Sequence, residues 1–131
     1  MGNEATVTFR SSAFNTSEVR PYFINDCCFG DDLARWMIGR LRDAGVETCA
    51  EPGQEDFGWY FEFSVPSGRH CCVLGFRPDD DAWFLWLERS RGFVGSVLGM
   101  RNRGIGADAV NSLNDALTGA GEITDLQWQS G

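Results

Sequence analysis

The stretch that decides the fold is FGWYFEFSVPSGRHCCVLGFRPDDDAWFLWL, residues 57–87. It contains three apolar runs, which are separated by two short sequences rich in proline, glycine, serine and aspartate. The runs are residues 57–65, 71–76 and 82–87, and the separating sequences are 66–68 and 78–81. In the first run Trp59, Phe61 and Phe63 alternate with more polar residues. Alternation with period two predicts strands, and connections this short predict antiparallel neighbours.

Helical spacing of apolar residues appears on both sides of this central stretch. Residues 31–44 predict one helix, whose expected core stripe consists of Leu33, Trp36, Met37, Leu41 and Ala44. Asp31 and Asp32 suit its N-terminus, and Gly45 suits its end. Residues 106–117 predict a second helix with Val110, Leu113 and Leu117 on one side.

Shorter strands are predicted at residues 6–9, 46–50 and 123–128. The expected fold class is therefore α+β: an antiparallel β-meander of about four to six strands, with two helices packed mainly on one face. The sequence contains no internal repeat and no long linker, so residues 1–131 are expected to form a single domain.

The strand at residues 82–87 is apolar on both sides. Trp83, Leu85 and Leu87 point one way, while Phe84 and Trp86 point the other. A sheet with helices on one face only usually has polar residues on its other face. We therefore expect the second face to be covered by residues 14–30, by residues 89–104, by a ligand or by a second copy of the chain. In the last case Trp83 or Trp86 would lie in the interface, since aromatic residues are enriched there.

The composition indicates a folded, acidic protein. Hydrophobic residues make up 43% of the chain, and 19 carboxylates oppose 11 cations, all of them arginine, for a net charge of -8. This balance argues against nucleic-acid and membrane-surface partners, but it is compatible with a basic protein partner. The acidic surface can also serve solubility alone. With no signal peptide or membrane span evident, a cytoplasmic location is expected.

Residues 89–106 form a basic, glycine-rich segment in this acidic chain. It contains Arg89, Arg91, Arg101 and Arg103 and no carboxylate. Arginine side chains close to a helix N-terminus could bind a small anionic ligand, or they could pair with the protein's own carboxylates. The G-x-G-x-x-A pattern at residues 104–109 lacks the parallel sheet that a nucleotide site requires, so no cofactor is expected.

Glu55 and Tyr60 are further candidates, because a carboxylate pair at residues 55–56 directly precedes an aromatic run. Such a pair could perform acid–base chemistry or bind a cation, but a solvated turn explains the same residues. Among the metal-binding residue types, His70 and Cys72 share a strand face without chelating spacing, so no metal site is expected. The five cysteines, of which four form two adjacent pairs, are expected to be free thiols.

The strings QEDFGWYF (54–61) and WLERSRG (86–92) resemble patterns in small uncharacterised bacterial proteins of the kind found on mobile gene cassettes. The resemblance implies no activity and assigns no residue a role. The features above favour a non-catalytic binding or interaction module, with a homodimer as one form. The alternatives are an immunity- or inhibitor-type protein that binds a basic partner, and a small enzyme that uses residues 89–106 with Glu55 or Glu88.

Overall fold

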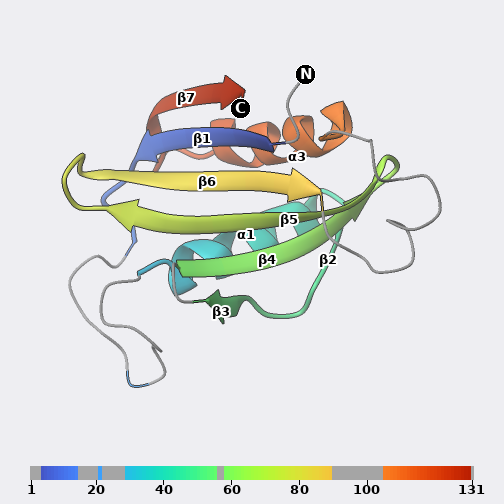
Figure 1. Ribbon diagram of the computed structural model, residues 1–131, viewed down its shortest axis with the longest axis horizontal. Helices are drawn as coiled ribbons and strands as arrows, with labels where there is room; N and C mark the ends of the chain where they lie inside the picture. The colour runs from blue at the N-terminus through green and yellow to red at the C-terminus, as the bar shows by residue number, and fades with distance from the viewer. Residues whose placement is uncertain (1–3, 15–20, 22–28, 56–57, 90–104, 131) are drawn as a thin grey trace.

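The computed structural model describes residues 4–14, 21, 29–55, 58–89 and 105–130. These residues form a seven-stranded sheet and two helices (Figure 1). The helices are α1 (Asp31–Asp43) and α3 (Ala107–Thr118). The strands are β1 (Glu4–Arg10), β2 (Glu47–Thr48), β3 (Gly53–Glu55), β4 (Gly58–Val65), β5 (Gly68–Arg77), β6 (Ala82–Arg89) and β7 (Thr124–Ser130).

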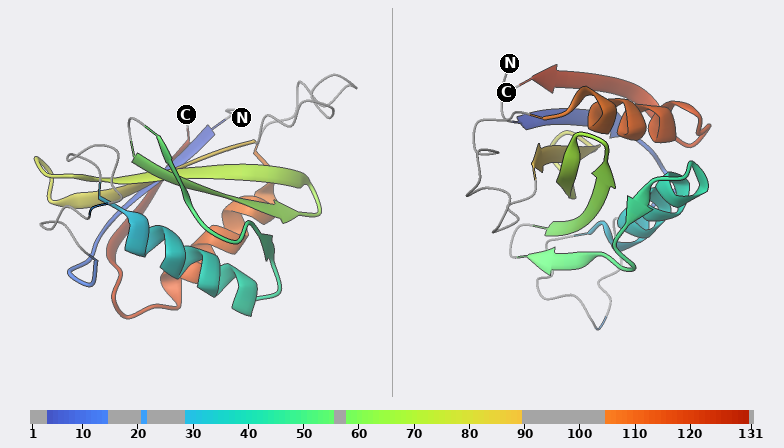
Figure 2. Two further views of the ribbon diagram at one scale, coloured as in Figure 1. Left: turned by 90° about the horizontal axis from the view of Figure 1, so that it is seen from below. Right: turned by 90° about the vertical axis from the view of Figure 1, so that its right-hand side faces the viewer.

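The strands follow the order β2-β4-β5-β6-β1-β7, with β3 also paired to β4, and every pairing is antiparallel. The central meander β4-β5-β6 is the stretch from which the fold was predicted. Strand β1 joins it at β6, and β7 extends the sheet beyond β1. Both helices lie on the same side of the sheet (Figure 2). The predicted α+β class, with an antiparallel sheet and two helices, is therefore confirmed.

The hydrophobic core lies between the sheet and the two helices. Alternate residues of β1, β4, β5 and β6 point into it, and the largest fully buried ones are Phe9, Phe61, Phe63, Leu74, Trp83, Leu85 and Leu87. The helices contribute Leu33, Met37, Leu41, Leu113 and Leu117, all of which are also fully buried. Burial of this apolar surface from both layers is the main force that holds helices and sheet together.

Helix α1 begins and ends within one residue of its predicted bounds, but its buried side differs from the predicted stripe. Trp36 is only half-buried and Ala44 is exposed, whereas Ala34 and Ile38 are buried with the three remaining stripe residues. Trp36 lies at the edge of the core, where its ring meets Phe14 edge-on and lies beneath the guanidinium of Arg40. The predicted stripe therefore shares three residues with the buried face of α1, but its other two lie outside that face.

Strand β3 was not predicted, because Pro52 and Gly53 indicate a turn at this point. Here the glycine permits a strand instead. Gly53 pairs with Tyr60 of β4, and a Cβ at Gly53 would lie 2.5 Å from Tyr60 Cζ, so only glycine leaves room for the ring. Among the predicted strands, 46–50 shrinks to the two residues of β2, and 71–76 extends to the ten residues of β5.

Candidate functional site

The sheet face opposite the helices is the candidate functional site, and we call it the outer face; Figure 1 looks onto it, with both helices behind the sheet. Strand alternation assigns its residues, because each neighbour of an inward-pointing residue must point outward. The outward residues of the meander are Tyr60, Glu62, Cys71, Val73, Gly75, Arg77, Ala82, Phe84, Trp86 and Glu88, and those of the flanking strands include Thr6, Thr8, Arg10, Gln127 and Gln129.

Trp86 lies in the middle of the outer face. It is the large hydrophobic residue that stays exposed within the described ranges, at 38% of its surface. The strand register places it between Val73 of β5 and Thr6 of β1, and Val73 in turn pairs with Tyr60 of β4. We call this set, with Gln129 of β7 at its end, the central row. Its apolar half is formed by Tyr60, Val73 and Trp86, and its polar half by threonine and glutamine.

Charged residues lie on both sides of the central row. Toward one strand end, Glu62, Cys71 and Glu88 are cross-strand neighbours, which we call the acidic row. Toward the other end, Arg77 and Ala82 are paired and Arg10 follows on β1; these three form the basic row.

Ion pairs and ring contacts hold these charged side chains near the sheet. Arg69 forms an ion pair with Glu62 at 3.0 Å, and Arg10 approaches Asp125 at 3.8 Å. The guanidinium of Arg77 lies 4.7 Å from the ring centroid of Phe84.

The sequence-predicted site residues are only partly brought together. Trp86 and Tyr60 both lie in the central row, but Trp83 points to the other side, where it is fully buried in the core between Phe14 and Phe76. Of the two tryptophans, Trp86 is therefore accessible from solvent and Trp83 is not.

Of the remaining predicted residues, Glu55 and Arg89 are placed by their backbones, at the ends of β3 and β6. Glu55 pairs with Gly58, and Arg89 pairs with His70. Arg91, Arg101 and Arg103 lie outside the described residues, as does most of segment 89–106.

A second polar cluster lies where the β4–β5 turn meets the N-terminus of α3. Asp108 accepts hydrogen bonds from the Ser67 hydroxyl at 2.6 Å and from the Ser67 backbone N–H at 2.9 Å. The Ser67 hydroxyl lowers the pKa of the Asp108 carboxyl against the effect of desolvation, and backbone N–H groups and His70 lower it further.

His70 is fully buried in the same region, stacked on Phe63. Its Nε2 accepts the Gly106 backbone N–H at 3.2 Å, so the ring proton is on Nδ1, which donates to the Gly68 carbonyl at 3.1 Å. Both ring nitrogens are thus engaged with backbone groups.

Ser67, His70 and Asp108 therefore differ from a hydrolase triad, in which the histidine would accept the serine proton. Here the serine hydroxyl donates to the carboxylate, and the histidine joins the β5 strand to the start of α3. No pattern in the sequence assigns His70 a role. The sequence features that could have indicated a structural role for His70 are its position next to a tight turn and the presence of Asp108 in the first turn of a helix distant in the chain.

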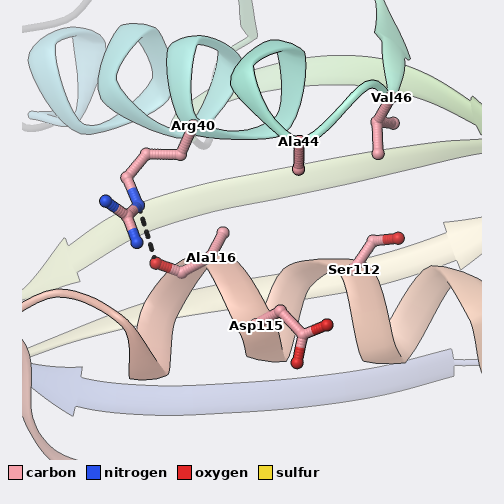
Figure 3. Close-up of a pocket in the computed structure, with 6 residues that line it drawn as sticks. All are labelled: Arg40, Ala44, Val46, Ser112, Asp115 and Ala116. Carbon is pink, nitrogen blue, oxygen red and sulfur yellow. Dashed lines mark hydrogen bonds between the residues drawn. The ribbon is translucent and has the colours of Figure 1, made fainter.

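Between the helices lies an open groove of about 220 Å³, lined by Arg40, Ala44, Val46, Ser112, Asp115 and Ala116. Figure 3 shows Arg40 reaching from α1 across the groove to α3, where its Nε donates to the Ala116 carbonyl at 2.9 Å. Arg40 also stacks over Trp36. Its guanidinium therefore joins the two helices, which makes it a packing element of the helical layer.

Within the described ranges, no three histidine, cysteine, aspartate or glutamate side chains gather as metal ligands. No helix in that part of the chain is long and apolar enough to cross a bilayer. Protein-family models, curated proteins and solved structures were compared with the chain, and none of them matches it.

Proposed function

We propose that this protein is a non-catalytic binding module whose contact surface is the outer face. The observation that carries the proposal is the exposure of Trp86, at 38% of its surface, in the middle of the sheet face opposite the helices. Tryptophan is among the residues that contribute most to protein–protein binding energy, above all near the centre of an interface. A buried position for this ring would be stabilising, and a partner can supply it.

The shape and polarity of the outer face support a macromolecular partner over a small molecule. Small-molecule sites are concave, whereas this surface is the side of a sheet. An apolar centre with a polar and charged border is the usual anatomy of a protein–protein interface. The outer face has this arrangement, with Tyr60, Val73 and Trp86 near the centre and the acidic and basic rows at the border.

The ionic groups of the face also favour binding over catalysis. A catalytic site needs side chains that converge on one reacting atom. Glu62 is instead engaged with Arg69, and Arg77 lies over Phe84. Arg69 and Arg77 remain exposed, so their charges are accessible to complementary charges of a partner.

The test compares Trp86→Ser with Trp36→Ser, which removes a half-buried tryptophan from the helix side. Each purified variant, after its fold is checked by circular dichroism, is analysed for self-association by sedimentation and for captured proteins by affinity purification. We expect Trp86→Ser alone to abolish the association that the wild type shows. Equal association by wild type and Trp86→Ser would refute the proposal.

A further inference from the structure

We propose that the partner of the outer face is a second copy of this chain, and that the two sheets pack face to face with their strands antiparallel. The inference rests on the proposed function, since it uses the same surface. The twofold axis would lie in the plane of the interface and perpendicular to the strands. Each strand then lies over the same strand of its partner, with its direction reversed.

The order of charges along the strands supports this arrangement. From one end to the other, the outer face presents Arg69, then the acidic row, then the apolar centre, then the basic row, and finally the exposed turn that contains Asp79. When the strands of the second copy run in the opposite direction, each positive position of one face lies opposite a negative position of the other. The outer face is therefore complementary to itself only if the strands of the two copies are antiparallel.

We place the twofold axis midway between the acidic and basic rows. The strand register then determines which residues of the two copies lie opposite each other. Arg77 then faces the partner's Cys71, with the partner's Glu62 and the partner's Glu88 on the neighbouring strands. Arg69 then lies at the strand end that meets the partner's exposed turn 78–81, which contains Asp79. Symmetry repeats both contacts, so the border of the interface carries four groups of opposite charges.

The centre of the face fits the same arrangement. Trp86 faces the partner's Phe84, so two aromatic pairs form around the axis. Val73 faces the partner's Gly75, which has no side chain and therefore leaves room for the valine. The alternative twofold axis, parallel to the strands, would oppose the acidic row to itself and the basic row to itself, which like-charge repulsion disfavours.

Interface size and net charge set the expected strength. Five strands of about eight residues cover roughly 600 Å² per copy, from the usual strand spacing and rise. This is near the lower limit of specific interfaces, so we expect a dissociation constant in the micromolar range. The net charge of -8 per copy opposes association weakly in physiological salt, because charges beyond about 8 Å are largely screened.

The experiment measures the dissociation constant by sedimentation equilibrium from about 1 to 100 μM, the range over which a micromolar dimer dissociates. Arg77→Glu and Glu88→Arg are each expected to weaken the homodimer at least about tenfold, since each places like charges together. A one-to-one mixture of the two variants should recover a dimer. In this heterodimer one contact keeps the native arginine and glutamate, and in the other contact the two charges have exchanged places, so both contacts pair opposite charges. The control Arg35→Glu makes the same charge change on exposed α1 and should leave the constant unchanged.

The outcomes separate this inference from the proposed function. A wild type that stays monomeric at the highest concentration overturns the inference, as does a dimer that resists both single variants or a mixture that does not associate. Trp86→Ser provides a second way to disrupt the face if Arg77→Glu fails to fold. If the wild type is monomeric but captures another protein in a Trp86-dependent manner, the inference fails while the proposed function stands. If neither association exists, both fail.

Discussion

Cys71 and Cys72 are neighbours in the chain, but their side chains lie on opposite faces of β5. Cys72 points into the core and is fully buried, whereas Cys71 lies half-buried on the outer face. Burial raises the pKa of the Cys72 thiol well above its usual value, and the adjacent Cys71 raises it further. Because the thiolate is the reactive form, the two cysteines should differ in reactivity.

We expect iodoacetamide to alkylate Cys71 and Cys49 in the native protein, and Cys72 only after denaturation. Trypsin cleaves after Arg69 and Arg89 but not at the Arg77–Pro78 bond, so fragmentation of the tryptic peptide 70–89 by tandem mass spectrometry can assign the label to either cysteine. Dilute protein should be used, so that self-association does not shield Cys71. Equal native labelling rates at Cys71 and Cys72 would contradict the burial of Cys72.

Asp108 links protonation to stability at the start of α3. Its pKa is lowered in the folded protein, chiefly by the Ser67 hydroxyl, so its ionised form stabilises the fold at neutral pH. That contribution is fully present above the unfolded carboxyl pKa of about 3.9 and is lost as the pH falls through the lower folded value.

Asp108→Ala should therefore lower the free energy of unfolding by about 1.5–3 kcal/mol at pH 7, the usual value of hydrogen bonds to a charged group. The deficit should shrink as the pH falls through the folded-state pKa of Asp108, where the wild-type carboxyl also becomes protonated. Urea denaturation at pH 7 and at a series of acidic pH values measures it. A deficit that is independent of pH would mean that the ionised carboxylate is not the stabilising form.

At the scale of elements, the junction between the β4–β5 turn and α3 depends on a glycine. A Cβ at Gly106 would collide with the Ser67 hydroxyl oxygen, and it would lie 2.5 Å from Asp108 Oδ1. Gly39, in contrast, lies on the exposed side of α1 with nothing within 4 Å of its would-be Cβ. The same substitution should therefore have opposite effects at the two positions.

Gly106→Ala should destabilise the protein by about 1–3 kcal/mol, the usual cost of overpacking. Gly39→Ala should stabilise it by about 0.5–1 kcal/mol, because alanine loses less backbone entropy than glycine in a helix. Thermal and urea unfolding of both variants would measure these effects. A neutral Gly106→Ala would show that the turn and α3 are not packed as the structure has them.

The elements differ in how far the sequence predicts them, for physical reasons. The two helices and the meander follow from strong periodicity and turn residues, which act locally. Strand β3 was missed because Gly53 signals a turn, and only the ring of Tyr60 from another strand explains it. Trp36 was assigned to the core because periodicity predicts only which residues share one side of the helix. How much of that side is buried depends on the elements packed against the helix, which periodicity does not specify.

At the scale of the whole molecule, the strand order could not be predicted. β1 lies between β6 and β7, and nothing in residues 4–10 specifies neighbours so distant in the chain. The candidate site was predictable only in part. Alternation made Trp83 and Trp86 equal candidates, and only the structure shows that Trp86 is the exposed one. Tyr60 was a candidate because a carboxylate pair precedes its strand. The acidic and basic rows exist only through the cross-strand register.

Strands β1 and β7 lie side by side in the sheet (Figure 1), and Ala5 is paired with Ser130. A circular permutant, with its original termini joined by a short glycine–serine linker and new termini opened at the exposed turn 79–81, keeps every strand pairing.

We expect this permutant to fold with the circular dichroism spectrum of the wild type and to unfold cooperatively, only modestly below the wild-type temperature. An unfolded permutant would show that the β5–β6 turn must be covalently intact. Because the new termini would carry Asp79 away from its hairpin, the permutant should also self-associate less well than the wild type. The order of strands along the chain can then change while the order of strands in space does not.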